Sequence, residues 1–353
     1  MNKYETIYKQ KRLPWGADLF YQSFKLLDLE GERNTEHRFE KYKFEYLLMK
    51  NMSVLDIGSN CGFLDLYISE HVKNIEGVEI ETHLCELANL VKDELNIKNV
   101  NFYNEDFNKF KTNNKYDLIL SLAQHAWMHN NFKDYINKIK RLLTIDGLFM
   151  IESHKINIGI EPEFENKLKE IEELGFTKLY TTRIDSGRDE RIFAIFRLGK
   201  FKQFKIANLI ETNEFKYYKR LDVAMTCLTL DELTKGSNKC ELYRKYHSLR
   251  HGWINMDSNL ETLKQYSDTA KDELVCLLKP IVLNRSEELF DGCHRLSSVI
   301  YHNQKYILAK KLELVTETDI NETKLLKNGL SQDEIETMRE KSRQIVKEYS
   351  DAK

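Results

Sequence analysis

The stretch from Ser53 to Phe63, SVLDIGSNCGF, decides the fold of this chain, because an apolar strand runs into a turn with glycine at both corners. A buried parallel strand is a nearly continuous apolar run. Glycine corners let backbone N–H groups approach a ligand that a side chain would exclude. The spacing Gly58-x-Asn60-x-Gly62 lacks the further glycine against which a pyrophosphate lies, so it disfavours a hydride-transfer cofactor. The stretch predicts a site for another nucleotide-type cofactor.

Another strand and an acidic residue follow at the spacing of a ribose site. Residues 74–78 predict a short strand, and Glu79 stands at its end, about twenty residues after Gly58. A carboxylate there can accept hydrogen bonds from both ribose hydroxyls. At these residues the chain resembles class I S-adenosylmethionine-dependent methyltransferases, which have a first motif similar to VLDIGSNCGF and a following motif similar to GVEIE. The resemblance implies S-adenosyl-L-methionine as cofactor and an α/β, Rossmann-like, seven-stranded sheet.

The resemblance continues in order through the first two hundred residues. Residues 101–107 resemble the third motif, which implies that Asp106 contacts the adenine amino group and that Phe107 packs on the ring. Residues 116–122 and 142–152 resemble the fourth strand and the step into the fifth, and 176–198 match the closing antiparallel hairpin. The residues expected at the cofactor are Arg38, Asp56, Gly58, Asn60, Gly62, Phe63, Glu79, Ile80, Asp106, Phe107 and Ser121.

Residues that follow the fourth and fifth strands are candidates for catalysis, because the methyl group points over this edge of the sheet. Alignment of the reacting atoms alone can supply about 7–11 kcal/mol. A hydroxyl acceptor gains about 10²–10⁴-fold more from a general base, whereas a phosphate or carboxylate acceptor needs none. In that case the histidines donate hydrogen bonds instead. The candidates are His125, His129, Glu152 and His154.

Two further stretches bear on the acceptor. The arginines of residues 31–38 can bind the methionine carboxylate or an anionic acceptor, with a solvated helix cap as the alternative. Residues 120–131 resemble methylphosphate-capping RNA methyltransferases through Trp127 and His129. Other relatives with the same glycine spacing act on tRNA uridine substituents, sugars and small metabolites. The sequence leaves these acceptor classes open.

A separate motif stands at residues 291–295, Asp-Gly-Cys-His-Arg, after a predicted strand at 280–283 and at the start of a predicted helix. Free N–H groups at a helix start, with His and Arg beside them, can bind a phosphate. The motif resembles the ParB/sulfiredoxin superfamily: sulfiredoxins share Gly-Cys-His-Arg, and the free-serine-kinase branch shares Asp-Gly and His-Arg. A structural or a reactive cysteine is the alternative. The predicted phosphate-binding residues are Asp291, Gly292, Cys293, His294 and Arg295.

Composition is that of a globular protein with reduced thiols. The 353 residues are 41% hydrophobic and 31% charged, and the net charge of -2 shows no pull toward nucleic acid or anionic lipid. Six cysteines show no CxxC pair or metal-ligand spacing, and no signal peptide or long apolar run is visible, so we expect a cytoplasmic protein without a bound metal or a membrane partner.

The length suggests two domains. We expect a methyltransferase domain at 1–200, a smaller α+β ParB/sulfiredoxin-like domain at 201–318 and a peripheral helical tail at 319–353, opened by a capping box at Ser331 and Glu334. The leading hypothesis is O-methylation of a small or carbohydrate-type, possibly phosphorylated, metabolite, with a phosphate or nucleotide at the smaller domain. The alternatives are a bifunctional methyltransferase–kinase and an RNA methyltransferase with a C-terminal recognition module. Nucleic acid is a possible but disfavoured partner.

Overall fold

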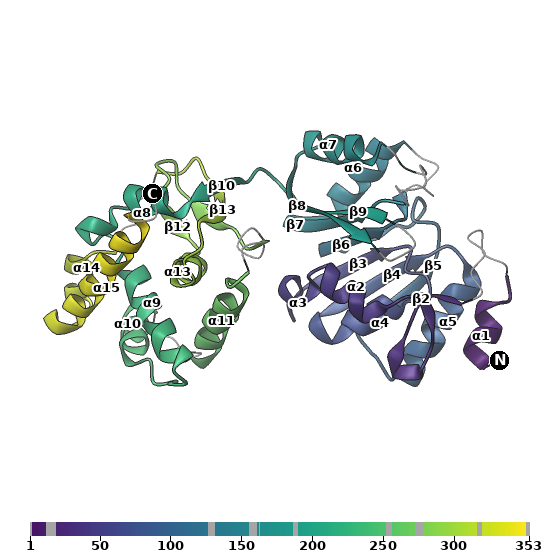
Figure 1. Cartoon of the computed structure of the whole chain (residues 1–353), viewed down its shortest axis with the longest axis horizontal. Coiled ribbons are helices and arrows are strands. Elements are labelled where there is room, and N and C mark those ends of the chain that lie inside the picture. Colours follow the sequence, from purple (N-terminus) through teal and green to yellow (C-terminus); the bar gives the residue numbers. More distant parts are fainter. Residues whose placement is uncertain are drawn as a thin grey trace. The chain divides into compact units, whose positions relative to one another are not determined.

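The chain forms two compact units in the computed structural model, Met1–Lys200 and Phe201–Lys353 (Figure 1). The structure describes residues 2–11, 19–125, 131–154, 161, 163–185, 190–251, 256–272, 278–315 and 320–350. In these parts of the chain, every helix is too short or too polar to cross a lipid bilayer.

A seven-stranded sheet with the order β5-β4-β3-β6-β7-β9-β8 forms the centre of the N-terminal unit. Five neighbouring strands are parallel: β3 (Ser53–Ile57), β4 (Asn74–Glu79), β5 (Val100–Asn104), β6 (Tyr116–Leu122) and β7 (Leu143–Glu152). The antiparallel hairpin of β8 (Phe176–Asp185) and β9 (Glu190–Leu198) pairs with β7 through β9. The predicted α/β class and sheet are confirmed. Within residues 142–152, the sequence suggests a turn at Asp146 and Gly147, but both residues are part of β7.

Helices cover both faces of this sheet, so its central strands are largely apolar. In β3, Val54, Leu55 and Ile57 are fully buried. Figure 1 shows α6 and α7 on one side of the sheet and α2, α4 and α5 on the other. The helices of this unit, with the two short strands that precede β3, are α1 (Lys3–Tyr8), β1 (Phe20–Gln22), β2 (Gly31–Arg33), α2 (Thr35–Lys41), α3 (Phe44–Leu47), α4 (Phe63–Ile68), α5 (Thr82–Glu94), α6 (Phe132–Leu142) and α7 (Phe164–Glu173).

The C-terminal unit is an α+β assembly with a four-stranded sheet of order β10-β13-β11-β12. β11 (Ile281–Leu283) runs parallel to β13 (Tyr306–Lys311), while β10 (Lys202–Lys205) and β12 (Leu289–Asp291) pair antiparallel with their neighbours. Its helices are α8 (Ile206–Thr212), α9 (Leu221–Thr234), α10 (Glu241–His251), α11 (Met256–Thr269), α13 (Cys293–Tyr301), α14 (Glu322–Lys327) and α15 (Gln332–Ser350). The predicted strand, helix and strand around residues 280–312 are present.

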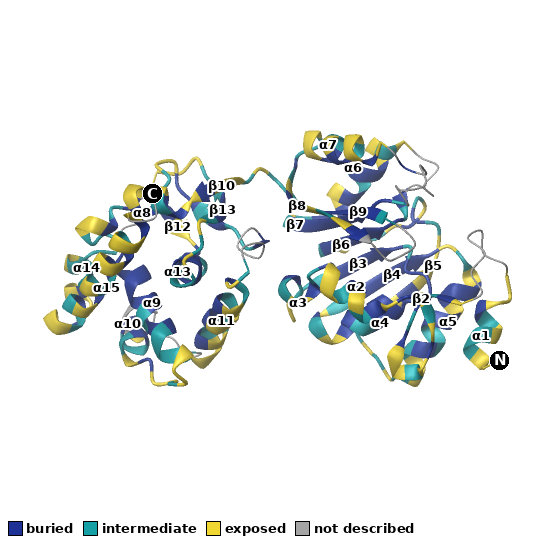
Figure 2. Cartoon of the chain, viewed as in Figure 1, coloured by how far each residue is buried: buried dark blue, intermediate teal, exposed yellow. Residues whose placement is uncertain are grey.

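The last helix, α15, is not the peripheral tail that its charged sequence suggested. Ile335 and Met338 pack in one apolar cluster of the C-terminal unit, and Ile345 and Tyr349 pack in the cluster that contains its sheet residues. The predicted capping box is present, because Ser331 N donates to Glu334 Oε2 at 2.7 Å and Glu334 N donates to Ser331 Oγ at 3.2 Å. Figure 2 shows the buried side of the helix, whose opposite side is exposed. The helix is therefore part of the unit's core.

We predict that Ile345→Ala lowers the free energy of unfolding by about 2–5 kcal/mol, because the side chain is 1% exposed and its removal leaves a cavity. Urea unfolding of the full chain, followed by circular dichroism, measures this change. The neighbouring exposed Gln344→Ala is the control and should stay within about 0.5 kcal/mol. Equal small effects of both substitutions would mean that α15 does not stabilise the unit.

Candidate active site

The glycine turn after β3 connects three strands at the carboxyl edge of the sheet. Gly58 and Gly62 have φ of +77° and +67°, where L side chains are strained. Gly58 N donates to the Val78 carbonyl of β4 at 2.8 Å. A Cβ at Gly58 would lie 2.0 Å from Cδ of Gln124, which follows β6. The turn thus brings β3, β4 and the segment after β6 together.

Glu79, at the end of β4, is bonded directly to this turn. Its Oε2 accepts from the backbone N–H of Asn60 at 2.8 Å and its Oε1 accepts from the N–H of Glu81 at 2.9 Å. Burial raises the pKa of this carboxyl, and the two N–H donors partly oppose the shift. Each oxygen keeps a lone pair for a further donor such as a ribose hydroxyl. Next to the buried Glu79, Ile80 is 62% exposed and offers an apolar surface.

Two of the expected cofactor residues are core residues in the structure. Phe63 has no exposed surface and packs against Phe20 and Phe24, with ring centroids 5.6 and 5.1 Å away. Phe107 is 3% exposed, with Tyr135 at its edge and Lys138 Nζ 4.4 Å from its ring centroid. A ring enclosed in this way is not open to adenine, so the expected packing of Phe107 on the cofactor is corrected to a core role. Ile80 is the better candidate for that contact.

The remaining expected cofactor residues are polar and buried or partly buried. Asp56 lies beside Asp65 of α4, and burial raises the pKa of both carboxyl groups. Ser121 Oγ accepts from the Tyr135 hydroxyl at 2.8 Å. Asp106 Oδ1 accepts from Asn108 N at 2.8 Å, within the turn after β5. Arg38 lies at the other end of the edge, beside β7.

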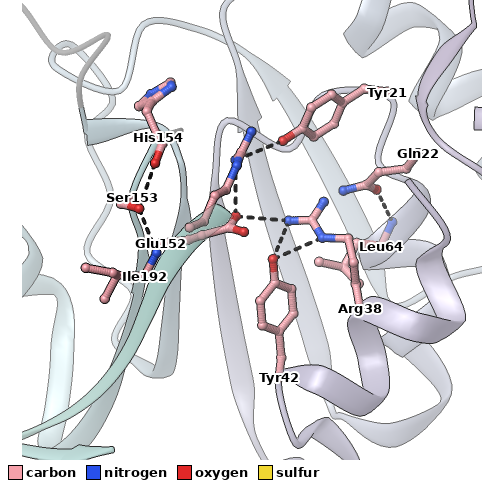
Figure 3. Close-up of polar contacts among 10 residues, drawn as sticks. Tyr21, Gln22, Arg38, Tyr42, Leu64, Glu152, Ser153, His154 and Ile192 are labelled. Carbon is pink, nitrogen blue, oxygen red and sulfur yellow. Dashed lines mark hydrogen bonds and ion pairs between the residues drawn. The ribbon is translucent and has the colours of Figure 1, made fainter. Parts of the chain in front are cut away.

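An arginine cluster, consisting of Arg38, Arg191, Glu152, Tyr21 and Tyr42, lies at the end of β7 (Figure 3). Glu152 has no exposed surface, and its Oε2 lies 3.5 Å from both Arg38 Nη2 and Arg191 Nη1. The Tyr42 hydroxyl accepts from Arg38 Nε and Nη2 at 3.0 and 2.7 Å, and the Tyr21 hydroxyl accepts from Arg191 at 3.3 Å. One carboxylate therefore holds an arginine of α2 and an arginine of β9.

The electrostatic potential of the arginine cluster is positive. Burial alone raises the pKa of Glu152, but Arg191 and Arg38 outweigh this effect and lower it. Burial likewise raises the pKa of Tyr21, yet Arg191, Arg33 and Arg38 together hold it below its ordinary value. A buried phenol whose pKa falls reports a strong positive potential.

A histidine cluster, consisting of His125, His154, Glu161 and Lys167, lies beside the arginine cluster. Glu161 Oε1 is 2.6 Å from His125 Nε2, and its Oε2 accepts from the backbone N–H of His154 at 2.8 Å. Lys167 pairs with the same carboxylate. Burial opposes ionisation, but the bonds from His125, Lys167 and His154 lower the pKa of Glu161 to about 2. Burial lowers the pKa of His125, and that of His154 to about 4. His129 and Trp127 lie outside the described residues.

The Asp-Gly-Cys-His-Arg motif begins α13 in the C-terminal unit. Arg295 Nη2 donates to Asp291 Oδ2 at 2.7 Å, and His294 Nε2 is 2.7 Å from the Tyr243 hydroxyl. Burial lowers the pKa of His294 to about 4, so its ring is neutral near pH 7. Burial also raises the pKa of the Cys293 thiol, which argues against a reactive thiolate. The other described cysteines, at 61, 85, 227 and 240, are buried and free, and Cys276 lies outside the described residues.

Arg295 also lines a small cavity together with Lys279 and Tyr266. Burial and the nearby Arg295 lower the pKa of Lys279 to about 8. The cavity volume is about 20 Å³, which suits about one water molecule and not a nucleotide. Lys279 and Arg295 thus bring two cationic side chains to one cavity beside the motif.

Sequence reasoning missed six residues that the structure brings to the two clusters and the glycine turn. They come from elements that precede β3 or follow β6: Tyr21, Tyr42, Gln124, Glu161, Lys167 and Arg191. For Arg191 the sequence offers one signal. It is a charged residue at the start of a run, 191–198, that has the alternating pattern of a strand.

Comparisons with known proteins find similarities to residues 48–197 of the N-terminal unit. Residues 48–197 match the family model described as a methyltransferase domain. Over 152 residues the chain is 28% identical to an uncharacterized RNA methyltransferase of Mycoplasma mobile, a match that covers 42% of this chain and 40% of that protein. Over 113 residues it is 26% identical to the malonyl-[acyl-carrier protein] O-methyltransferase of Bacillus anthracis, covering 31% of this chain and 39% of that protein.

The chain thus spans about 40% of the length of these curated relatives. Among solved structures, the N-methyltransferase NodS from Bradyrhizobium japonicum in complex with S-adenosyl-L-homocysteine is 15% identical, with a TM-score of 0.42. That match covers 57% of this chain and 100% of that chain. The family match makes S-adenosyl-L-methionine the cofactor of this domain.

We predict that Glu79→Ala weakens S-adenosylmethionine binding by about 1.5–3 kcal/mol, because charge-assisted bonds to the ribose are lost. Isothermal titration calorimetry of the full chain measures the affinity. The exposed Glu86→Ala on α5 removes the same charge away from the turn and should leave binding unchanged. Equal affinity of the wild type and Glu79→Ala would contradict the assignment.

Proposed function

Taking residues 48–197 as an S-adenosylmethionine-dependent methyltransferase domain, we propose that the protein transfers a methyl group to a hydroxyl oxygen of a small or carbohydrate-type acceptor. The observation that carries this proposal is the bond between His125 and Glu161 at the same sheet edge as the glycine turn. A histidine bonded to a carboxylate is the arrangement that a general base requires.

In this proposal the cofactor supplies an electrophilic methyl group, and the chain's task is to hold it and the acceptor in line. Glu79 would accept the ribose hydroxyls, Ile80 would contact the adenine ring and Asp106 would accept from its amino group. Gly58 and Gly62 keep side chains away from the cofactor's path. These roles rest on the burial of Glu79, the exposure of Ile80 and the left-handed conformation of both glycines.

His125 has the properties of a general base for a hydroxyl acceptor. The neutral ring donates its Nε2 proton to Glu161, which fixes the tautomer and leaves Nδ1 as the acceptor. Nδ1 has no hydrogen-bond partner among the described residues. Because burial lowers the pKa of His125, the ring stays neutral at pH 7 and can take a proton. The rings of Phe132 and Phe164 lie beside the imidazole, with centroids 5.9 and 5.4 Å from its own. In this proposal the acceptor hydroxyl bonds to Nδ1 itself.

We predict that His125→Asn lowers kcat about 10²–10⁴-fold and leaves cofactor affinity unchanged. The wild-type rate should rise with pH through an ionisation below 6.5, because a protonated His125 cannot act as a base and its folded pKa is lowered. Transfer of labelled methyl groups to a small-metabolite extract measures the rate. His71→Asn, a partly exposed histidine of the same unit, is the control. A flat pH–rate profile with an active His125→Asn enzyme would contradict the base and indicate an acceptor that is already anionic.

An RNA acceptor is the other candidate, favoured by the match to the Mycoplasma mobile protein named as an RNA methyltransferase. Under that proposal the C-terminal unit is a recognition module. The net charge of -2 favours the small acceptor instead, because nucleic-acid binding relies on clustered positive charge. Running the same labelling assay separately on RNA and on metabolites distinguishes the two.

For the C-terminal unit we propose that residues 291–295 hold a phosphate group, as the likeness to the ParB/sulfiredoxin superfamily implies. The convergence of Arg295 and Lys279 beside the start of α13 supports this proposal. The small volume of that cavity disfavours the nucleotide that a methyltransferase–kinase needs. Loss of phosphate binding in Arg295→Ala, with methyl transfer retained, is the expected result.

A further inference from the structure

In the arginine cluster, the ion pair between Arg38 and Glu152 leaves charged atoms of both side chains without a close contact. Glu152 Oε2 lies 3.5 Å from Arg38 Nη2, at the outer limit of a hydrogen bond, and at the same distance from Arg191 Nη1. Arg38 Nη1 and Glu152 Oε1 have no hydrogen-bond partner among the described residues. Both side chains are more than nine-tenths buried. A buried charged group left in this state is costly.

The surroundings of Arg38 favour an anion at its open N–H. Its two tyrosine neighbours, Tyr21 and Tyr42, are neutral hydroxyl groups that cannot balance its charge. Arg38 also acts on the buried Asp56, but burial keeps the pKa of this carboxyl raised, so its negative charge is disfavoured. The lowered pKa of Tyr21 reports the same positive potential independently of any single contact. An additional negative group would therefore be stabilised here.

We propose that the methyl acceptor carries a carboxylate or phosphate group and that Arg38 and Arg191 bind it. The inference rests on the proposed methyl transfer and adds the class of acceptor. Guanidinium groups bind planar carboxylates and phosphates with paired N–H bonds, which positions the ligand as well as attracting it. Glu152 lies two residues before His154, so the bound acid stands at the sheet edge that carries the histidine cluster. Its hydroxyl can then face His125.

A carboxylate could also come from the methionine end of the cofactor. The two sources differ in a measurable way, because a cofactor carboxylate is present in S-adenosylhomocysteine itself. An anion that binds only to the cofactor's carboxylate site would compete with S-adenosylhomocysteine. An acceptor anion would instead bind to the complex that S-adenosylhomocysteine has already formed.

The test titrates malonate and inorganic phosphate into the full-length protein saturated with S-adenosylhomocysteine, by calorimetry, with neutral malonamide as the uncharged probe. We expect malonate or phosphate to bind and malonamide not to bind. Arg191→Ala should lower the affinity for the anion at least tenfold while changing S-adenosylhomocysteine affinity less than threefold. Arg183→Ala, whose side chain is 67% exposed on the neighbouring strand β8, is the matched control and should change neither.

Three results would overturn the proposal. One is that the wild-type complex binds no anion. Another is that Arg191→Ala leaves anion binding unchanged. The third is that Arg191→Ala lowers S-adenosylhomocysteine affinity at least tenfold while the complex shows no anion binding. Arg191→Lys keeps the positive charge and so controls for misfolding of Arg191→Ala. It should still lower the affinity for the anion several-fold, because the paired N–H bonds of the guanidinium group are lost. Failure of the wild type to bind S-adenosylhomocysteine at all would instead refute the proposed methyl transfer.

Discussion

The buried negative charge of Glu152 is the constraint on which the carboxyl edge of the sheet depends. The residue ends β7 with no exposed surface, so its charge must be met by other buried groups. Arg38 comes from α2, 114 residues earlier, and Arg191 from β9, 39 residues later. The N-terminal segment is therefore held against the sheet partly by this charge. Removing one partner of a buried pair typically costs about 3–5 kcal/mol, which makes the cluster important for folding as well as for binding.

Groups with different properties lie next to one another at the carboxyl edge of the sheet. The glycine turn and Glu79 occupy the β3–β4 end, His125 of the histidine cluster follows β6, and the arginine cluster lies where β7 ends and β9 begins. The pKa values of both groups are lowered, that of His125 by burial and that of Glu161 by its bonds to His125, Lys167 and His154 against the effect of burial, so His125 is kept neutral while Glu161 is kept ionised. Neutral acceptor atoms and fixed charges thus lie side by side at one edge, as transfer to an oxygen acceptor requires.

The sequence predicted the strands of the methyltransferase sheet well, because long apolar runs with glycine turns leave little choice of structure. It also predicted from spacing that Glu79 and the glycine turn belong to one site, and in the structure Glu79 accepts a hydrogen bond from the turn; their roles at the cofactor stay predictions. It could not predict Arg191, Tyr21 or Glu161, because their contacts join residues that are far apart in sequence. Phe63 and Phe107 were assigned to the cofactor by motif position, whereas the demand for core volume decided their packing. In α15 the apolar residues Ile335, Met338 and Ile345 are visible in the sequence, but their charged surroundings led to the prediction of a peripheral helix.

A crystal structure of the full-length protein with S-adenosylhomocysteine tests the central claim most directly. The account predicts that the ribose hydroxyls lie within hydrogen-bond distance of the Glu79 carboxylate and that the sulfur atom lies on the side of His125 and Glu152. Arg38 and Arg191 should remain free of the ligand's own carboxylate. A ligand bound elsewhere, or a Glu79 that still bonds only to the backbone N–H groups of Asn60 and Glu81, would contradict the account.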